Sequence, residues 1–228
     1  MSKCENCIIR QFNALRAMST EELKKVSDSK ITKTIKKGEV IFNEGEKLHG
    51  VYCIREGVSK LSKLSANGKD QIVKLVSKGE VLGQRSVIVA EAVNLGAVAV
   101  NEMTVCYIPK EKITNALSQN PNFTLEMLRH MAHDLKQADD VIVNMSQKTV
   151  HQRVAEVFLY LKTNFGEDKD GFIALVLSRE EIANLVGTAT ESAIRVISEF
   201  KKKGLLLTSG KKIGIGDEKK LRELIVGF

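Results

Sequence analysis

Residues 178–197, SREEIANLVGTATESAIRVI, constrain the fold of this chain more than any other segment. Ser178 and Glu181 have the S-x-x-E spacing of a capping box, which satisfies free backbone donors where a helix begins. Gly187 follows the last apolar residue, where helices commonly end in a left-handed conformation. The capping spacing recurs at Thr188–Glu191. The segment therefore predicts two short helices joined by a glycine turn, the second beginning at once after the first.

The second helix is predicted to have an apolar inner face and a mixed outer face that carries Thr190, Glu191, Ile194 and Arg195. Arginine can donate two hydrogen bonds to guanine, and glutamate can accept one from the amino group of cytosine. Such a helix suits the major groove of DNA. The alternative is an ordinary salt bridge, because Glu191 and Arg195 lie four residues apart and project from the same face.

A basic hairpin is predicted directly after these helices. Three lysines at 201–203 precede an apolar run at 205–208, a Ser209-Gly210 turn and the segment Lys211–Ile215. Short strands separated by such a two-residue turn are typical of a β-hairpin. A helix-turn-helix followed by a hairpin is a winged helix, and its lysines suit contacts with phosphates. The pattern predicts a protein that binds double-stranded DNA.

The composition narrows the classes of protein to which this chain can belong. The chain has 228 residues, a hydrophobic content of 43% and a formal net charge of +7, which permits a polyanionic partner. It has no apolar run long enough to span a bilayer and no secretory leader, so we expect a cytoplasmic protein without a membrane partner. We find no phosphate-binding glycine loop, nucleophile elbow or zinc-protease helix, and we predict no enzyme.

Upstream of the predicted winged helix, the sequence pattern is typical of short strands. From Ile31 to Pro109, apolar pairs and alternations are interrupted by glycines at regular intervals. Repeated short strands of this kind indicate an antiparallel barrel or roll. Short helices are predicted before it, at 19–27, and after it, at about 110–118.

A long helix is predicted from Pro121, a residue suited to a first helical turn. Its apolar positions follow the three- and four-residue spacing of a coiled-coil seam; they are Met127, Met131, Leu135, Ala138, Ile142 and Met145. Because the seam is narrow and its flanks are polar, we expect a parallel dimer interface. The alternative is a single helix packed on its own domain. A further helix at about 148–164 and a strand from Phe172 to Leu177 should lead into the winged helix.

The predicted fold class is α+β. Residues 1–120 form a double-stranded, jelly-roll-like β-roll that acts as a sensor domain. Residues 121–146 form the dimerisation helix, and residues 147–228 form the winged helix-turn-helix domain that binds DNA.

This order of elements resembles the Crp/Fnr family of bacterial transcription regulators over nearly the whole chain. The most specific matches are KGEVIFNEG at 37–45, YCIREG at 52–57 and the helix-turn-helix. The resemblance implies a cytoplasmic homodimer that binds a palindromic DNA site, with one recognition helix in each half-site. It also implies a regulator, activator or repressor, that works with RNA polymerase and is controlled allosterically, through a cyclic-nucleotide-binding-like roll, by a signal that the sequence does not identify.

The resemblance also assigns candidate DNA contacts. Glu191 and Arg195 match the family residues that read a TGA-like core, and Thr190 and Ile194 match neighbouring base-contact positions. Ser178 and Arg179 fall where the family contacts phosphates or flanking bases. Together with the turn and the wing, the expected DNA-binding residues are Ser178, Arg179, Thr188, Thr190, Glu191, Ile194, Arg195 and Lys211.

A cyclic nucleotide is not the expected effector. Family members that bind one carry a glutamate for the ribose and an arginine for the phosphate. The corresponding stretch here is Gly83, Gln84, Arg85 and Ser86, and it lacks both groups in the family register. A buried anion without such a clamp costs several kcal/mol. These four residues remain the candidate pocket for another small molecule.

The four cysteines offer a second kind of sensor. In the expected compartment they indicate metal binding, redox chemistry or simple burial rather than disulfides. Cys4, Cys7 and Cys106 match cluster cysteines of oxygen-sensing family members, which would place another near Asn13. Iron–sulfur clusters usually take four thiolates, so a cluster here would need a ligand other than cysteine at the fourth position. Cys53 is interpreted as a small buried hydrophobe inside the roll.

Overall fold

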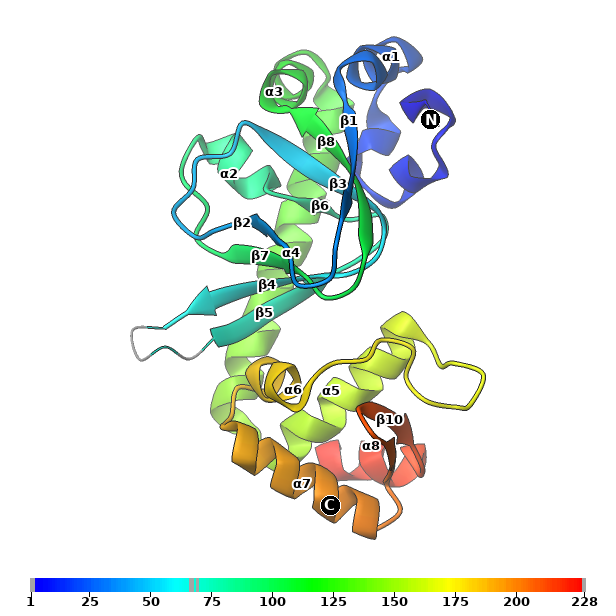
Figure 1. The fold of residues 1–228 in the computed structure, drawn as a ribbon. Helices are drawn as coiled ribbons and strands as arrows, with labels where there is room; N and C mark the ends of the chain where they lie inside the picture. Colours follow the sequence, from blue (N-terminus) through cyan, green and yellow to red (C-terminus); the bar gives the residue numbers. More distant parts are fainter. Residues whose placement is uncertain (1–2, 66–67, 69, 227–228) are drawn as a thin grey trace. The chain divides into compact units, whose positions relative to one another are not determined.

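The computed structural model describes residues 3–65, 68 and 70–226 (Figure 1). The chain divides into two compact units, each of which is described by itself. The roll unit contains the residues up to 63 together with 73–137. The winged-helix unit contains 64–72 and the residues from 138 onward.

The roll unit is built from two antiparallel sheets of four strands each. One has the order β1-β8-β3-β6 and the other β2-β7-β4-β5. The strands are β1 Ile31–Ile35, β2 Val40–Phe42, β3 Gly50–Glu56, β4 Ser59–Leu64, β5 Asp70–Val76, β6 Val81–Leu82, β7 Gly96–Ala99 and β8 Met103–Pro109. Helices α1 Thr20–Ser29, α2 Gln84–Val89 and α3 Lys110–Gln119 complete the unit, so the predicted roll is confirmed.

The sheet that contains β3 and β8 is buried on both faces. Because side chains alternate along a strand, Ile54 and Val105 point into the apolar core between the sheets. Their neighbours Cys53 and Cys106 point the other way, into a second apolar cluster. This cluster is formed with the N-terminal segment (residues 4–18), α1, α3 and the start of α4. Cys53 is therefore buried as predicted, but its side chain lies on the outer face of this sheet and not inside the roll.

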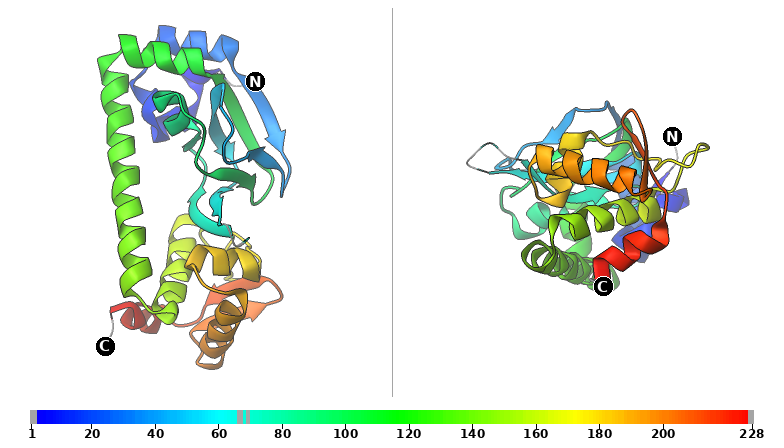
Figure 2. Two further views of the ribbon diagram at one scale, coloured as in Figure 1. Left: turned by 90° about the vertical axis from the view of Figure 1, so that its left-hand side faces the viewer. Right: turned by 90° about the horizontal axis from the view of Figure 1, so that it is seen from below.

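Helix α4 spans Pro121–Gln147 and begins at the predicted proline; the left view of Figure 2 follows it as one continuous helix. Phe123 and Met127 are buried in the second cluster of the roll unit. Leu128, Leu135 and Ile142 are 61%, 65% and 66% exposed. The predicted seam is therefore wrong at its first member, because Met127 packs on its own unit.

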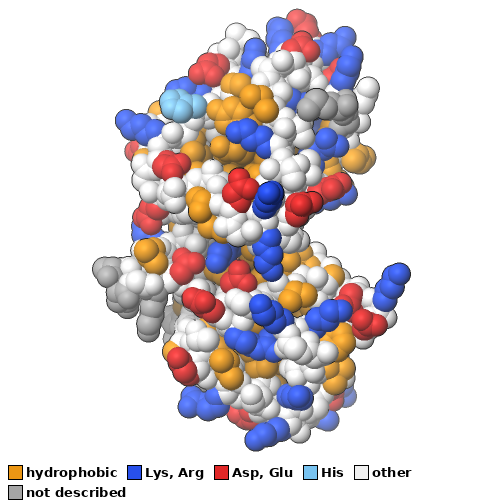
Figure 3. Space-filling view, in the orientation of Figure 1, with side chains coloured by type: hydrophobic (Ala, Val, Ile, Leu, Met, Phe, Trp, Pro, Cys, Tyr) orange, Lys and Arg blue, Asp and Glu red, His pale blue; other side chains and the backbone are white. Residues whose placement is uncertain are grey.

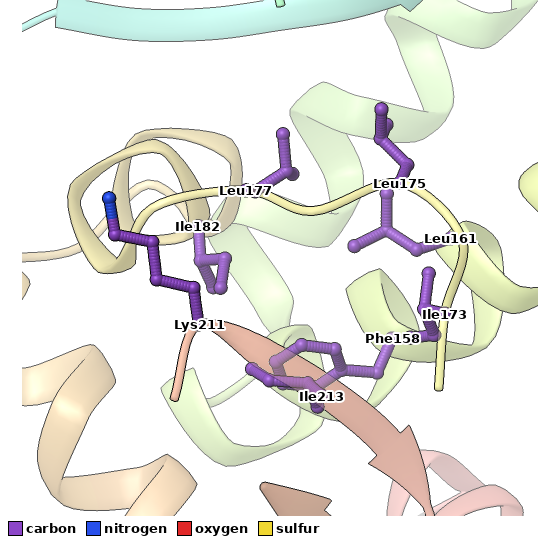
Figure 4. Close-up of a pocket in the computed structure, with 8 residues that line it drawn as sticks. All are labelled: Phe158, Leu161, Ile173, Leu175, Leu177, Ile182, Lys211 and Ile213. Atoms are coloured by element: carbon purple, nitrogen blue, oxygen red, sulfur yellow. The ribbon is translucent and has the colours of Figure 1, made fainter. Parts of the chain in front are cut away.

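The winged-helix unit contains α5 Val150–Phe165, α6 Arg179–Val186, α7 Thr190–Lys202, β9 Leu206–Ser209, β10 Lys212–Ile215 and α8 Glu218–Val226. Helices α5, α6 and α7 pack on one another around an apolar core. Figure 4 shows part of this core, where Phe158, Leu161 and Ile182 approach Ile213 of the wing. Over the described residues, none of the helices combines the length and apolarity needed to cross a membrane.

The predicted strand from Phe172 to Leu177 does not form. Ile173, Leu175 and Leu177 are buried in alternation, as a strand pattern requires. Only Ile173 has an isolated bridge, to Glu167, and its N–H donates to the carbonyl of Ile213 at 2.9 Å. The alternation therefore reflects an extended segment whose side chains fill the core without a continuous neighbouring strand.

Candidate nucleic-acid interface

Helix α6 begins with the predicted capping box. Ser178 Oγ accepts a hydrogen bond from the backbone N–H of Glu181 at 3.1 Å. Glu181 Oε2 accepts one from the backbone N–H of Ser178 at 2.8 Å. Two free donors at the helix start are thereby satisfied, which fixes the direction in which α6 leaves the preceding segment.

The turn between α6 and α7 requires glycine for two reasons. Gly187 has a φ of 72°, in the left-handed region that side chains disfavour. A Cβ atom at this position would lie 2.7 Å from Met145 Sδ, far inside van der Waals contact. A side chain at this position would therefore have to displace the flexible end of Met145, besides adopting the disfavoured left-handed conformation.

The second predicted capping box is wrong. Helix α7 begins at Thr190, and its N-cap is Ala189, which makes no side-chain cap. Thr188 is still part of the turn, because its N–H donates to the carbonyl of Ala183 at 3.1 Å. This closing bond of α6 delays the start of α7. Glu191 instead lies in the first turn of α7, where a negative charge is favoured by the helix dipole.

Helix α7 has one buried and one exposed face. Its inner face consists of Ala193, Val196, Ile197 and Phe200, all 3% exposed or less. On the outer face Glu191, Ile194 and Arg195 are exposed and Thr190 is half-buried. Within the described residues, no ion pair or hydrogen bond joins Glu191 to Arg195. The salt-bridge alternative is therefore not seen, and both side chains are available to a partner.

The wing is a tight hairpin whose turn differs by one residue from the prediction. Ser209 pairs with Lys212, so the turn residues are Gly210 and Lys211. Gly210 has a φ of 57°, and only glycine takes that conformation readily. Lys211 is exposed at the tip, and Figure 4 shows its ammonium group pointing away from the apolar core.

Arg179 links the start of α6 to the tip of the wing. Its guanidinium donates to the carbonyl oxygens of Gly210 at 3.3 Å and Lys211 at 3.4 Å. Burial lowers the pKa of this guanidinium. Arg179 therefore holds two parts of the candidate interface together, besides being an expected DNA contact.

The lysines of this unit fall into two groups. Lys203 forms an ion pair with Glu199 at 2.8 Å. Hydrogen bonds from Lys203 and His151 lower the pKa of Glu199 to about 2. Lys212 forms ion pairs with Asp168 at 2.7 Å and Asp170 at 3.6 Å. The hydrogen bond to Asp168 raises the pKa of Lys212.

Three other lysines are exposed and have no ion-pair partner in the described part of the chain; they are Lys201, Lys202 and Lys211. The lower part of Figure 3, which is the winged-helix unit, shows lysine and arginine side chains across its visible face with acidic groups between them. The unpaired lysines are the better candidates for phosphate contacts, since a paired lysine must first give up its carboxylate.

Sequence reasoning missed Arg153 of α5. Its Nε donates to the carbonyl of Val186 at 2.9 Å, and its Nη1 donates to the carbonyl of Lys148 at 2.7 Å. Its Nη2 donates to the carbonyl of Gly187 at 3.3 Å. One guanidinium thus joins the α4–α5 connection to the helix-turn-helix turn. Two of its acceptors, the carbonyls of Val186 and Gly187, are more than 30 residues away in the sequence, and no local pattern could have indicated them.

The candidate effector residues lie at the start of α2. Gly83 is the N-cap of this helix, with a φ of 82°, and Gln84 is its first residue. Arg85 is exposed, whereas Ser86 is buried and donates from its hydroxyl to the carbonyl of Glu91. The segment is thus a helix start in which the one cationic side chain lies at the surface.

The cysteines lie far from the DNA-facing elements in sequence but close to one another. Cys4, Cys53 and Cys106 are buried in the second apolar cluster of the roll unit, and Cys7 packs against it. All four are free thiols. Among the described residues, no group of three cysteine, histidine or acidic side chains already has a metal-binding arrangement.

Two family models match the chain. Residues 32–120 match the cyclic nucleotide-binding domain, and residues 152–224 match the Crp-like helix-turn-helix domain. Among curated proteins, the transcriptional activator protein Anr of Pseudomonas aeruginosa is 28% identical over 229 residues, which cover 98% of this chain and 93% of that protein. The fumarate and nitrate reduction regulatory protein of Escherichia coli is 28% identical, covering 97% and 89%.

Solved structures share the fold. FixK2 from Bradyrhizobium japonicum superposes with a TM-score of 0.76 at 25% identity, covering 86% of this chain and 96% of that one. A Crp/Fnr-family protein from Eubacterium rectale gives a TM-score of 0.79 at 23% identity, covering 93% and 97%. A cyclic-nucleotide-binding-type roll, a long helix, a Crp-like helix-turn-helix and these relatives agree, and the chain belongs to the Crp/Fnr family of DNA-binding transcription regulators.

Proposed function

We propose that this chain acts as a homodimer that reads a palindromic DNA site, with one α7 helix in each half-site. The observation that carries the proposal is the outer face of α7. Glu191 and Arg195 are exposed and unpaired there, while the opposite face of the same helix is buried. A bidentate arginine and an acidic acceptor are side chains that distinguish base pairs in the major groove.

The proposed base readers are Glu191 and Arg195, which would recognise a TGA-like core, with Thr190 and Ile194 beside them. Ile194 is 43% exposed and could pack on a thymine methyl group. Arg179 and Lys211 would contact phosphates from the helix start and the wing tip. Ser178 and Thr188 lie at either end of α6 and would contact the sugar-phosphate backbone of the DNA.

The proposed dimer interface is the exposed stripe of α4. Leu128, Leu135 and Ile142 recur every seven residues, and Met131, Ala138 and Met145 lie between them at the complementary heptad positions. Large aliphatic side chains left this exposed favour burial against a second copy of the same helix. Two parallel α4 helices would give the two-fold symmetry that a palindromic site requires.

In this proposal the roll unit biases the α4 pair, and so changes the fraction of dimers competent for DNA. One relative is named a transcriptional activator. An activator works with RNA polymerase, which is therefore the expected further partner of this chain.

Selection of binding sites from random duplex DNA tests the proposal. The protein is purified without oxygen, and one portion is then exposed to air. We expect a two-fold symmetric site with a TGA-like core in each half in at least one sample. Enrichment of a site without symmetry would contradict the dimer, and no enrichment in either sample would contradict base reading by α7.

A further inference from the structure

A very short connection joins α4, the helix of the proposed dimer interface, to the helices of the winged-helix unit. Helix α4 ends at Gln147 and α5 begins at Val150, so the connection is the residue pair Lys148–Thr149. Each of these residues has two free backbone dihedrals, and the pair would act as a swivel unless other contacts held it. The direction of α7 relative to the end of α4 therefore depends on the contacts around this connection.

Local contacts tie the connection to the two helices that it joins. The backbone N–H of Lys148 donates to the carbonyl of Asn144 in α4 at 3.1 Å. Thr149 and Gln152 form a capping box at the start of α5. The ammonium group of Lys148 forms an ion pair with Glu156 of α5. These four contacts fix the ends of α4 and α5, but they do not reach the helix-turn-helix.

Arg153, in the first turn of α5, supplies the link to the turn between α6 and α7. Its Nη1 donates to the carbonyl of Lys148 at 2.7 Å and reaches the carbonyl of Met145 at 3.5 Å. Its Nε and Nη2 donate to the carbonyls of Val186 at 2.9 Å and Gly187 at 3.3 Å. A guanidinium holds its N–H groups in a rigid planar fork. The carbonyls that end α4 and those that end α6 are therefore held at one mutual angle.

The position of this guanidinium is also favourable electrostatically. The last carbonyls of a helix have no partner within it, and the helix dipole places negative charge there. Arg153 lies at two such ends, because its acceptors belong to the end of α4 with its connection and to the end of α6. The side chain of Met145 also lies directly beside Gly187, so packing and hydrogen bonding join the same elements. All of these residues belong to the winged-helix unit.

We propose that Arg153 is a positioning residue that fixes the angle between the end of α4 and α7, and thereby the half-site spacing that the dimer accepts. The inference rests on the proposed function, because spacing has a meaning only for a dimer on a two-fold symmetric site. Arg153 itself reads no base, since its donors are used by backbone carbonyls. It sets the specificity for the arrangement of a site, whereas Glu191 and Arg195 set the specificity for its sequence.

Half-site spacing is a sensitive measure of this angle. One added base pair moves a half-site by about 3.4 Å along the duplex and rotates it by about 35°. In a dimer joined through two α4 helices, a fixed angle between α4 and α7 brings both reading helices to one such arrangement. A dimer that swivels at Lys148–Thr149 reaches several arrangements at similar free energy.

The alternative is that Arg153 contributes only to folding stability. Val154→Ala is the matched control, because Val154 is the next residue of α5 and is 0% exposed. Its truncation leaves a cavity and lowers stability but keeps every hydrogen bond of Arg153. Arg153→Gln removes both the charge and the fork. Arg153→Lys keeps the charge without the fork, and so separates the two contributions.

The test uses the full-length wild type and these three variants on duplexes that carry two copies of the half-site selected by the wild type. The spacing between the half-sites is changed one base pair at a time around the selected value, and a duplex with one half-site measures base reading alone. Hydrogen exchange without DNA follows the amides of Lys148 and Gly187, which close the last turns of α4 and α6. Thermal unfolding shows that each variant folds and compares the stabilities.

We expect a change of one base pair to weaken wild-type binding at least about tenfold, as the loss of a base contact does, and to weaken Arg153→Gln less than about threefold. Arg153→Lys should resemble Arg153→Gln, because one ammonium group cannot hold two sets of carbonyls at a fixed angle. Val154→Ala should keep the wild-type profile. Exchange at Lys148 and Gly187 should become at least about fivefold faster in Arg153→Gln, as the loss of one hydrogen bond implies.

A spacing profile of Arg153→Gln as narrow as that of the wild type would overturn the inference and leave the base-reading dimer intact. An equal broadening in Val154→Ala would also overturn it, because lost stability alone would then explain the effect. Unchanged hydrogen exchange in Arg153→Gln would show that the guanidinium does not hold the two helix ends. A wild type that does not distinguish its half-site from a scrambled duplex would contradict the proposed function and the spacing claim together, while hydrogen exchange would still test the Arg153 contacts.

Discussion

The two units present their chemically distinctive side chains in opposite ways. On α7 of the winged-helix unit, Glu191 and Arg195 are exposed and have no partner within the described residues. In the roll unit, Cys4, Cys53 and Cys106 are buried where the N-terminal segment packs on the sheet of β3 and β8. The first arrangement suits a large partner that docks on a surface. The second arrangement keeps these thiols inside a packed apolar cluster, away from any large partner.

The difference also affects what each unit tolerates. Polar groups on an exposed face can be changed at little cost in folding free energy. A change within the buried cluster of the roll unit removes packing contacts and hydrogen bonds together, and so lowers the free energy of unfolding. Substitutions should therefore separate function from stability in the winged-helix interface and couple them in the roll unit.

The largest effect is expected from Leu135→Asp on α4. Leu135 is 65% exposed in the single chain, so the substitution should leave the monomer folded. In a parallel dimer two symmetry-related carboxylates would be buried, at a cost of about 4 kcal/mol or an approximately 1000-fold weaker dimer. Sedimentation measures this weakening.

Gln137→Asp is the matched control, since it adds the same charge to the same helix at an exposed position outside the stripe. It should leave the dimer intact. Equal dimer strength in Leu135→Asp and the wild type would show that the stripe is not the interface.

Gly187→Ala should destabilise the protein by about 1–3 kcal/mol, mainly through left-handed backbone strain, because the clashing atoms belong to the flexible end of the Met145 side chain. Gly210→Ala isolates the backbone contribution. It has a positive φ of 57° but no atom within 4 Å of the added Cβ, so about 1 kcal/mol is expected. Urea unfolding measures both, and equal losses would mean that the contact with Met145 does not matter.

Asn13→Ala should cost about 1–3 kcal/mol. The substitution removes the donor to Gly79 O at 2.9 Å and the acceptor for the backbone N–H of Leu15 at 3.0 Å. Both groups are left in a buried site. Asn43→Ala, at an exposed asparagine whose amide contacts only a nearby glutamate, should change the unfolding free energy by less than about 0.5 kcal/mol. A comparable loss at the two positions would contradict the contrast between buried and exposed polar groups.

The smallest effect is expected at the wing. Lys211→Ala should weaken DNA binding on every sequence and lower the slope of log affinity against log salt by about one, since one phosphate contact is lost. Lys212→Ala should change the slope less, because Lys212 is held by Asp168 and Asp170. Salt titrations of binding to one duplex compare the two variants. A larger change of slope for Lys212→Ala than for Lys211→Ala would contradict the distinction between paired and unpaired lysines.

How far the sequence could predict each site follows from how local the site is. The capping box at Ser178, the glycine turn and the inner face of α7 were all predicted, because each depends on residues within one or two helical turns. Thr188 was misassigned because a hydrogen bond to Ala183 keeps it in the turn. Glu191 and Arg195 were found on the predicted outer face.

The gathering of the four cysteines in one cluster depends on information that no local pattern contains. The short run around Cys53 does not indicate which face of the sheet is covered by the N-terminal segment. Its pairing with Cys106 depends on the register of β3 with β8, across a separation of more than 50 residues. Met127 was likewise assigned to the wrong surface, because periodicity shows that a helical face is apolar but not what covers it.

The most direct test of the central claim compares wild type and Arg195→Ala on the selected palindrome and on a scrambled duplex of equal length. The account predicts that affinity for the palindrome falls by about 1–3 kcal/mol while affinity for the scrambled duplex stays nearly unchanged. Ser198→Ala, at an exposed position of the same helix, should alter neither. An equal loss on both duplexes would contradict the claim that the outer face of α7 reads bases.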